Sequence, residues 1–374
     1  MSSERGRKVV HFSTVHPASD VRVFRKECLT LRDAGYDVTL FARGEGGLIE
    51  GIRVKPVAEH PNRALRVLLG PPQLLGVLLR ERAAVYHFHD PELLPVGFAL
   101  RILGKCVIYD AHEWVPGDVS SKPYLRPSIA RSLGWIASKL ERLAARTLSQ
   151  VVAATPFIAS QLPGTRTTVI QNYPILAELS HPETEPTVTP RRRPNTLVYV
   201  GGLSVERCGA EILEAMRLVA IRDPAIRLVA AGGLEDGLDP TELENVDHLG
   251  YLDRRGVRDI MGSGLLGVVL LRDLPNCRDA LPTKFFEYLA AGLAVVVSRS
   301  TAPIAEITEQ LNCGRVVDET DPTAIADAIV SLLHDPREAA KMGERGRAAV
   351  VDRYDWQSEG RRLVDLYDRL TCVR

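Results

Sequence analysis

Short apolar runs alternate with longer stretches of helical periodicity along this chain, and that alternation constrains the fold more than any other feature. The apolar runs are rich in Val, Ile and Leu, which is typical of strands buried on both faces of a parallel sheet. Strands that alternate with helices predict right-handed βαβ units and an α/β fold. In the first half, predicted strands cover residues 9–13, 38–42, 85–88, 106–110 and 151–154, and predicted helices cover 23–34 and 128–147.

The pattern restarts after residue 195, and a length of 374 residues fits two domains. We expect two doubly wound, Rossmann-like domains over residues 1–180 and 196–352, facing each other across a cleft. Ligands bind such sheets at the carboxyl ends of the strands. Residues 181–195 contain four prolines and are predicted to be the linker. Residues 353–374 predict an amphipathic helix that packs on either domain, with a return to the N-terminal domain as one option. The second set of strands is predicted at 197–200, 228–231, 265–271 and 294–298, with helices at 210–220, 256–261, 283–291 and 322–333.

The charges balance overall, with 47 Lys and Arg against 47 Asp and Glu. A zero net charge argues against nucleic acid as a partner, because a general nucleic-acid binder needs a basic excess. The hydrophobic content of 45% excludes a disordered chain. The balance hides an asymmetry, because residues 1–150 carry a net charge of +7 and residues 151–374 one of −7. The N-terminal part is therefore the better candidate to face an anionic partner.

Cysteine usage and hydropathy predict a cytoplasmic protein. The six cysteines are scattered and form no C-x-x-C pair, which favours reduced thiols over disulfides. The polar N-terminus and the short apolar run after it do not fit a signal peptide. No apolar stretch approaches the roughly 20 residues of a membrane-spanning helix, so any membrane contact is expected to be peripheral, at the inner face.

The predicted helix at residues 128–147 offers such a contact. Its apolar side chains fall on one stripe, and basic side chains together with Trp135 fall on another. A Trp among Arg and Lys suits an anionic lipid surface, so residues 122–147 are a candidate peripheral membrane contact; a solvated helix face is the alternative. The apolar stripe is Ile129, Leu133, Ile136, Leu140 and Leu143, and the basic one is Arg131, Lys139, Arg142 and Arg146.

Several common catalytic motifs are absent from the sequence. No G-x-G-x-x-G follows a strand and no G-x-x-x-x-G-K-[ST] occurs, which argues against a dehydrogenase and a P-loop enzyme. His112-Glu113 lacks the second His of a zincin, and no G-x-S-x-G elbow is found.

Glycines and cations in the C-terminal half predict a phosphate site. Gly201-Gly202 follow a predicted strand and let a ligand approach the backbone, and the next helix offers free N–H groups to an anion. Arg207 lies just before that helix and can clamp a phosphate through two hydrogen bonds.

A second helix start, around Thr283 and Lys284, has the same character. Pro282 suits the first helical position, which places Thr283 and Lys284 in the first turn, where a hydroxyl and an ammonium join the free N–H groups. Glu287 lies one turn further on the same face, and its carboxylate can accept two hydrogen bonds from a ribose diol.

Asp279 and Glu287 are separated by seven residues and followed by Tyr288-Leu-Ala-Ala-Gly-Leu-Ala-Val-Val-Val-Ser298. This region resembles the E-x7-E region of family-4 retaining glycosyltransferases, which have the GT-B fold of two Rossmann-like domains. The resemblance continues through residues 313–317, 321–322 and 354–356. It implies that Glu287 binds the nucleotide ribose, that Asp279, Ala280 and Leu281 lie near the donor sugar, and that Thr283 and Lys284 lie near the diphosphate.

The chain departs from the family pattern at two points. Where the family often has Gly-Arg-Leu, this chain has Gly201-Gly202-Leu203, so one usual phosphate-binding cation is missing. Arg207 matches the usual Lys, with Cys208 intervening before the next glycine. The first acid of E-x7-E is Asp279, whose side chain is shorter than that of Glu.

Histidines and carboxylates gather at predicted strand ends in the N-terminal half, and such residues line the cleft of this kind of fold. His87, His89 and Asp90 form one segment, and Asp110, His112 and Glu113 form another. By the resemblance, His112 lies near the transferred sugar, with Glu113 and Asp90 close by. A third segment with His16, Asp20 and Arg22 resembles a subgroup from polysaccharide and natural-product pathways, and would border the acceptor together with His89 and Asp90.

The resemblance implies transfer of a sugar from a nucleoside-diphosphate donor, with UDP favoured, to a hydroxyl of a glycan, lipid-linked or small-molecule acceptor. The cations at the diphosphate remove the need for a metal or a cofactor. Candidate catalytic residues are His112, Glu113 and Asp279, and the donor phosphate itself takes the acceptor proton. Three alternatives stay open: a non-hydrolysing sugar-nucleotide epimerase of the same fold, a metal-dependent hydrolase using the histidine and carboxylate cluster, and a non-catalytic binding module.

Overall fold

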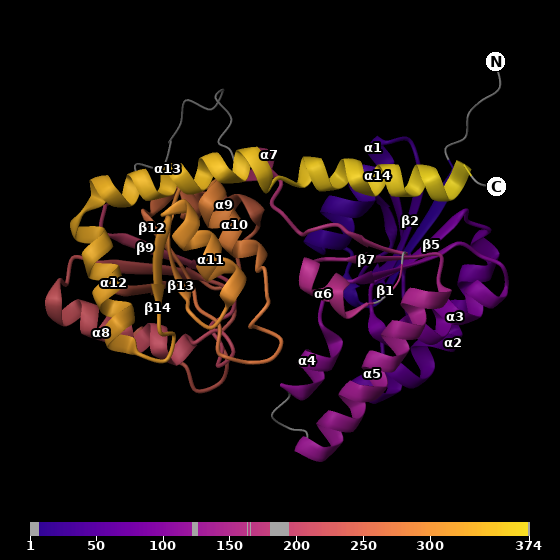
Figure 1. Cartoon of the computed structure of the whole chain (residues 1–374), viewed down its shortest axis with the longest axis horizontal. Helices are drawn as coiled ribbons and strands as arrows, with labels where there is room; N and C mark the ends of the chain where they lie inside the picture. The colour runs from indigo at the N-terminus through magenta and orange to yellow at the C-terminus, as the bar shows by residue number, and fades with distance from the viewer. Residues whose placement is uncertain (1–6, 122–125, 163, 165, 180–193, 373–374) are drawn as a thin grey trace. The chain divides into compact units, whose positions relative to one another are not determined.

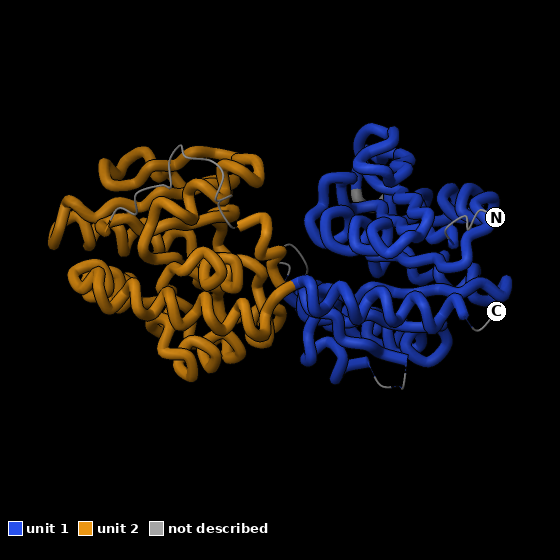
Figure 2. The backbone as a smooth tube through the Cα atoms, turned by 90° about the horizontal axis from the view of Figure 1, so that it is seen from above, with its two compact units in different colours: residues 1–172, 356–374 blue, residues 173–355 orange. Residues whose placement is uncertain are grey.

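The computed structural model describes residues 7–121, 126–162, 164, 166–179 and 194–372. The chain forms two compact units, of which unit 1 comprises residues 1–172 and 356–374 and unit 2 comprises residues 173–355 (Figure 2). Each unit has its own sheet with helices on both faces (Figure 1). The expected α/β architecture of two doubly wound, Rossmann-like domains is confirmed. The predicted linker lies, apart from its last two residues, outside the described residues.

Within the described residues, unit 1 is built on an eight-stranded sheet. Its strands are β1 (Lys8–Pro17), β2 (Asp37–Arg43), β3 (Gly47–Ile49), β4 (Ile52–Pro56), β5 (Val85–Phe88), β6 (Val107–Ala111), β7 (Gln150–Ala153) and β8 (Thr167–Val169). They lie in the order β3-β4-β2-β1-β5-β6-β7-β8, and only β3 pairs antiparallel. His11 on β1 lies opposite His87 on β5, which lies opposite Ile108 on β6. The carboxyl ends of these three strands therefore share one edge.

The two faces of this sheet differ in chemistry. On one face Val10, Phe12 and Phe88 pack in an apolar core with Leu78 of α2 and Leu100 of α3. The opposite face carries the buried His11 and His87, and there α14 packs against η1, α1 and β5. The helices are η1 (Val21–Cys28), α1 (Leu29–Asp33), α2 (Arg63–Glu81), η2 (Pro91–Leu93), α3 (Leu94–Ile102), α4 (Val115–Ser120), α5 (Pro127–Thr147), α6 (Pro156–Gln161) and α14 (Trp356–Cys372).

The C-terminal helix packs within unit 1. Nε1 of Trp356 donates to Oγ1 of Thr30 across 3.0 Å, and Glu359 accepts a hydrogen bond of 2.9 Å from the backbone N–H of Gln171. The helix predicted over residues 353–374 is divided, because the backbone leaves the helical conformation at Tyr354. Arg353 therefore ends α13 (Pro336–Arg353) in unit 2, and α14 begins at Trp356.

Unit 2 has a six-stranded parallel sheet in the described residues, in the order β11-β10-β9-β12-β13-β14. Its strands are β9 (Thr196–Val200), β10 (Arg227–Ala231), β11 (Val246–His248), β12 (Leu266–Val269), β13 (Ala294–Ser298) and β14 (Gly314–Val317). Helices α8 and α12 pack together in one core, and α9 and α10 contribute to the other. The helices are α7 (Leu176–Leu179), α8 (Gly209–Arg222), η3 (Pro240–Glu242), α9 (Arg254–Ser263), α10 (Thr283–Ala290), α11 (Ala302–Leu311), α12 (Pro322–His334) and α13.

Candidate active site

Two pairs of glycines lie side by side at the carboxyl edge of the unit 2 sheet. Gly201-Gly202 follow β9, and Gly232-Gly233 follow β10. Gly201 N–H donates to the carbonyl of Ala231 across 2.7 Å. Gly232 has φ +135°, and a Cβ atom there would lie 2.2 Å from the carbonyl oxygen of Gly201, so only glycine fits. The sequence predicted the first pair and missed the second.

Lys284 reaches back from α10 to this glycine edge. A Cβ atom on Gly201 would lie 3.1 Å from Nζ of Lys284, and Nζ lies 3.3 Å from the hydroxyl of Tyr199. Burial, with the nearby charge of Arg207, lowers the pKa of Lys284 to about 7. An anionic ligand there would raise this pKa again and restore the full charge. Thr283 opens the helix, so Pro282 is the N-cap rather than the first helical residue expected, because its ψ of 130° is extended.

Arg207 supplies a second cation at the same place. Its Nη1 donates to the carbonyl of Gly202 across 3.5 Å, and the side chain is otherwise exposed. Cys208 takes a left-handed backbone, with φ 52°, and ends the loop before α8 begins at Gly209. Two cations and two open glycines therefore converge on one spot, which suits a diphosphate.

Glu287 is held by an arginine that the sequence analysis did not single out. Its Oε1 accepts a hydrogen bond of 3.0 Å from Nη1 of Arg254, and Nη2 of Arg254 lies 3.0 Å from Glu178. The Glu287 side chain is only 10% exposed. Because Arg254 starts α9 and Glu287 lies in α10, no local spacing links the two in the sequence. The ion pair orients the carboxylate predicted to bind a ribose.

Asp279 and Leu281 lie in the partly exposed loop between β12 and α10. The loop is tied to the segment before α8, because Arg272 N–H donates to the carbonyl of Glu206 across 2.9 Å and Asn276 donates to its carboxylate at 2.9 Å. The two segments that carry Asp279 and Arg207 are thus fixed to each other within unit 2.

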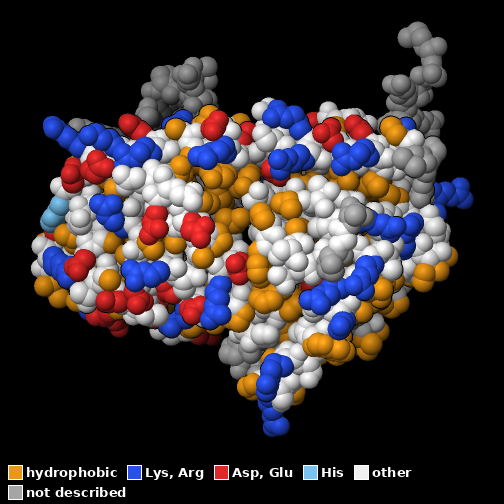
Figure 3. Space-filling view, viewed as in Figure 1, with side chains coloured by type: hydrophobic (Ala, Val, Ile, Leu, Met, Phe, Trp, Pro, Cys, Tyr) orange, Lys and Arg blue, Asp and Glu red, His pale blue; other side chains and the backbone are white. Residues whose placement is uncertain are grey.

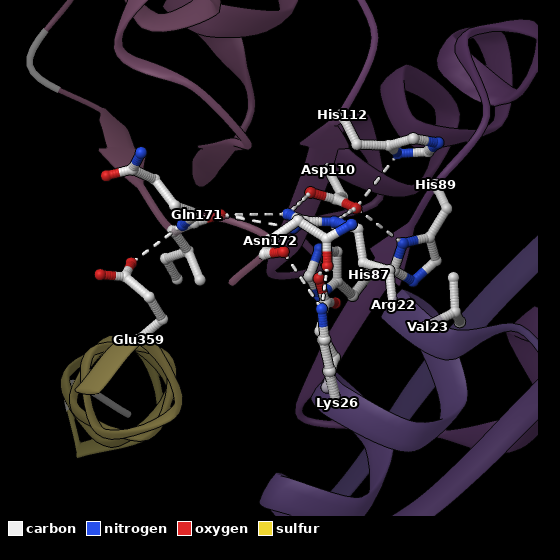
Figure 4. Close-up of polar contacts among 12 residues, drawn as sticks. Arg22, Val23, Lys26, His87, His89, Asp110, His112, Gln171, Asn172 and Glu359 are labelled. Atoms are coloured by element: carbon white, nitrogen blue, oxygen red, sulfur yellow. Dashed lines mark hydrogen bonds and ion pairs between the residues drawn. The ribbon is translucent and has the colours of Figure 1, made fainter. Parts of the chain in front are cut away.

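In unit 1, Arg22 and Asp110 form a buried bidentate ion pair. Nε and Nη2 of Arg22 donate to the two carboxylate oxygens of Asp110 across 2.9 and 2.6 Å (Figure 4). Although burial disfavours the charge, the guanidinium holds the pKa of Asp110 well below its usual range. Arg22 was expected to border the acceptor. Since it is 5% exposed, we infer that it orients Asp110 instead of contacting an acceptor.

A chain of hydrogen bonds runs from Asp110 through buried imidazoles to α14. His89 Nδ1 lies 3.1 Å from Asp110 Oδ2, and His89 Nε2 lies 3.1 Å from His11 Nδ1. The hydroxyl of Tyr367 lies 2.8 Å from both His11 Nε2 and His87 Nδ1. Burial and a neighbouring imidazole hold the pKa of His11 and of His87 well below the usual value, so both rings are neutral. An ionised Asp110 accepts a hydrogen bond from Nδ1–H of His89, so Nε2 of His89 must accept one from Nδ1–H of His11. The tautomer of each further group in the chain of hydrogen bonds is fixed in the same way.

Two imidazoles next to this chain of hydrogen bonds, those of His112 and His16, are accessible to solvent. His112 is 16% exposed, and its Nδ1 lies 3.2 Å from Oδ2 of Asp110 without hydrogen-bond alignment. The ring of His16 packs edge-on at 5.0 Å from that of His112. His89, predicted on the acceptor side, is fully buried beneath them, whereas Glu113 is exposed. His112 is thus the member of the cluster that is both open to a ligand and in contact with the buried ion pair.

Asp20 and Asp90 flank His16. Nδ1 of His16 lies 3.1 Å from Asp20, and Nε2 lies 3.6 Å from Asp90. Burial opposes protonation, but the hydrogen bond to Asp20 raises the pKa of His16 above its ordinary value, and the pKa of Asp20 falls to about 2. The backbone N–H of Thr14 donates to Asp90 across 2.6 Å. His16 is therefore a partly exposed imidazole at the edge of the site, and its carboxylate neighbours favour its protonated form.

A metal centre in this part of unit 1 would need several ligand atoms close to one another. Among the described residues, two groups bring ligand atoms within 4.8 Å of one another, and neither includes Asp90 or Glu113. A metal held by both His11 Nδ1 and His89 Nε2 would displace the proton between them. The carboxylate of Glu27 accepts no hydrogen bond, and burial raises its pKa well above the ordinary value. The groups are His11, Glu27, His87 and His89, and His89, Asp110 and His112.

Comparison with known proteins identifies the class of enzyme. Residues 181–349 match the model of glycosyl transferases group 1, and residues 21–172 match that of Glycosyltransferase Family 4. The chain is a glycosyltransferase. This glycosyltransferase has the GT-B fold that the E-x7-E resemblance implied.

Similar proteins include other glycosyltransferases, and a similar solved structure has the same fold. The glycosyltransferase is 22% identical to an MMP α-(1→4)-mannosyltransferase of Mycolicibacterium hassiacum, over 75% of this chain and 70% of the relative. A 39% identical match to a GDP-mannose-dependent α-(1-6)-phosphatidylinositol monomannoside mannosyltransferase of Mycolicibacterium smegmatis spans only 24% of this chain and 23% of that protein. The structure resembles sucrose-phosphate synthase from Thermosynechococcus elongatus, with a TM-score of 0.78 and 16% identity. The match covers 98% of this chain and 100% of that one.

Proposed function

We propose that this glycosyltransferase transfers a hexosyl group, with retention of configuration, from a nucleoside-diphosphate sugar to an acceptor hydroxyl. The observation that carries the proposal is the convergence of Lys284, Arg207 and the glycine edge at one spot in unit 2. Breaking the bond between the anomeric carbon and the phosphate leaves the electron pair on the diphosphate, and these cations stabilise it.

The acceptor then bonds to the anomeric carbon on the face from which the diphosphate leaves. Its hydroxyl proton passes to the departing phosphate oxygen, so no protein base is needed. In this scheme His112 polarises and positions the sugar, Glu113 and Asp279 are further candidate catalytic residues, and Glu287 binds the ribose. A metal is not required, because the two cations stabilise the negative charge that develops on the diphosphate.

We propose a UDP-sugar as the donor, which the solved complex of Anabaena HepE with UDP and glucose supports (TM-score 0.71, 15% identity, 97% and 99% coverage). GDP-mannose is the second candidate, because the 39% identical relative is named as GDP-mannose-dependent. The acceptor is a glycan, a lipid-linked sugar or a small molecule. We place the reaction in the cytoplasm, since all six cysteines are free thiols.

Thermal unfolding with UDP, GDP, dTDP and ADP, each with and without EDTA, tests the proposal. A ligand that binds only the folded protein raises its Tm. We expect one nucleotide to raise the Tm equally in both conditions, and that nucleotide names the donor base. No shift with any nucleotide, but a lower Tm with EDTA alone, would instead support a metal centre at the histidine cluster. Turnover of the donor sugar without an acceptor, yielding an isomeric sugar nucleotide, would support an epimerase.

A further inference from the structure

Helix α5 carries its large apolar side chains on the outside. The residues that face the rest of unit 1 are small, as with Ala130, Gly134 and Ala144, and all three are buried. A Cβ atom on Gly134 would lie 3.3 Å from the carbonyl oxygen of Pro116, so α4 packs closely against this face. A helix on a water-soluble protein has the opposite arrangement. The exposed side chains are Ile129, Leu133, Ile136, Leu140 and Leu143, at 39–47%, and Trp135 at 64%.

The exposed apolar surface continues over two neighbouring helices. Helix α3 contacts both α5 and α2, so the three lie in one layer on the same side of the sheet. Leu68 of α2 is 70% exposed, and Ile102 at the end of α3 is 85% exposed. Figure 3 shows hydrophobic and basic side chains together over this part of unit 1. Apolar surface shared among several helices marks an interaction site rather than scattered exposure.

The acidic side chains of this layer are buried, whereas the charged side chains on its surface are basic. Glu81 of α2 is buried and lies 2.6 Å from Lys8 and 2.5 Å from Lys55. Glu141 of α5 is buried and accepts a hydrogen bond of 2.9 Å from Tyr109. Along the described parts of α2, α3 and α5 no exposed residue is acidic. The charged side chains on the exposed face of α5 are all cations, namely Arg131, Lys139, Arg142 and Arg146.

We propose that this layer of α2, α3 and α5 docks unit 1 on an anionic lipid bilayer. The apolar stripe enters the headgroup boundary, and the cations of α5 contact lipid phosphates. Trp135, with Nζ of Lys139 5.5 Å above its ring, has the amphipathic character of an interfacial anchor. A second copy of the chain fits poorly, because the same cations would face each other. No helix in the described part of the chain is long and apolar enough to cross a membrane, so the contact is with the surface.

Sedimentation of the full-length protein with vesicles tests this, and needs neither donor nor acceptor. We expect binding to vesicles that contain phosphatidylglycerol, and little binding to vesicles of phosphatidylcholine alone. Arg142→Glu should weaken binding about five-fold or more, because each basic residue near such a surface contributes a comparable factor. Leu133→Ser with Leu140→Ser should weaken it at least as much through the apolar stripe. Leu68→Ser should also weaken binding if α2 shares the surface.

The matched control is Ile221→Ser, because Ile221 is 78% exposed on α8 of unit 2. It should bind vesicles like the wild type, and all variants should keep the wild-type Tm. Absence of sedimentation of the wild type, or equal weakening by Ile221→Ser, would overturn the proposal. So would a dimer in solution that the Leu133 and Leu140 substitutions dissociate, because a second copy would then cover the surface. Loss of donor binding with intact vesicle binding would count against the proposed function alone.

Discussion

The hydroxyl of Tyr367, on the last helix, lies 2.8 Å from Nε2 of His11, on the first strand. With His11 Nδ1 donating to His89, this hydroxyl must donate to Nε2 and accept from His87 Nδ1. The C-terminal helix thereby completes the hydrogen bonds of a chain that ends at Asp110, the partner of His112. Tyr367, which belongs to none of the sequence motifs, thus fixes the buried imidazoles beneath the candidate site.

Removing that hydroxyl should cost stability. Tyr367→Phe leaves Nε2 of His11 buried without a donor, and we expect the free energy of unfolding to fall by about 1–3 kcal/mol. Urea unfolding measures the loss, and nucleotide affinity, which belongs to unit 2, should not change. Tyr36→Phe is the control, because its partner Asp368 is exposed and can be hydrated instead, so its loss should be smaller.

Lys284 should make donor binding depend on pH. Its pKa is about 7 in the free protein, so above pH 7 the neutral amine must take up a proton when a diphosphate binds. We expect nucleotide affinity to fall as pH rises above 7, by up to about ten-fold per pH unit. Calorimetric titration between pH 7 and 9 measures this. Lys284→Arg should flatten the profile, since arginine stays charged, and an equally steep profile in that variant would exclude Lys284 as the titrating group.

Glu287 and Arg254 should act as one unit in donor binding. Glu287→Ala removes the carboxylate predicted to bind the ribose and should weaken nucleotide binding. Arg254→Met leaves the carboxylate in place but unpaired, so it should weaken binding through the same group. In the double variant the losses should be less than additive. Additive losses in nucleotide Kd would show that the two residues contribute separately.

His112 should affect the chemical step more than donor binding. His112→Ala removes the accessible imidazole beside Asp110, so we expect kcat to fall while the nucleotide Kd stays within about two-fold. His87→Gln provides a comparison, because His87 is buried and out of reach of a ligand. Loss of nucleotide affinity in His112→Ala with an unchanged kcat would reverse the assignment.

Glu141 should destabilise the protein as pH rises through the weakly acidic range. Burial raises its pKa to about 7 from an ordinary value of 4.5, so between those values the folded state keeps a proton that the unfolded state has lost. Stability therefore falls as pH rises from 4.5 to about 7 and levels off above. Glu141→Gln keeps an acceptor for Tyr109 and should reduce this slope in urea unfolding at several pH values. An unchanged slope would assign it to other groups.

Most strands were predictable because each is a continuous apolar run that both faces of a sheet bury, but β3, β4, β8, β11 and β14 were not predicted. Strand 85–88 and strand 294–298 match the observed β5 and β13 at both ends. Helix α2 was missed because Pro71 and Pro72 lie inside it, and because its exposed apolar residues hide the usual amphipathic pattern. Propensity argues against a helix there, whereas packing of Leu74 and Leu78 in the core stabilises one.

The candidate site was predictable where its residues are close in sequence. Lys284 and Glu287 share one helix, and Gly201 and Arg207 share one loop, so spacing alone places them. Partners contributed from elsewhere in the fold, such as Arg254 for Glu287 and Tyr367 for His11, leave no local signal in the sequence. The burial of His89 and Arg22 was missed for the same reason, since Asp110, which contacts both, meets them only in the folded protein.

The position of α14 has a consequence for biosynthesis. Unit 1 contains both the first 172 residues and the helix that begins at Trp356, whereas residues 173–355 of unit 2 are contiguous. A ribosome therefore synthesises all of unit 2 before it makes α14 of unit 1. The first half of the chain must wait, with His11 and His87 lacking their tyrosine partner, until α14 has been made. Unit 1 therefore cannot be completed before unit 2 has been synthesised, which departs from the usual order in which the N-terminal domain folds ahead of its successor.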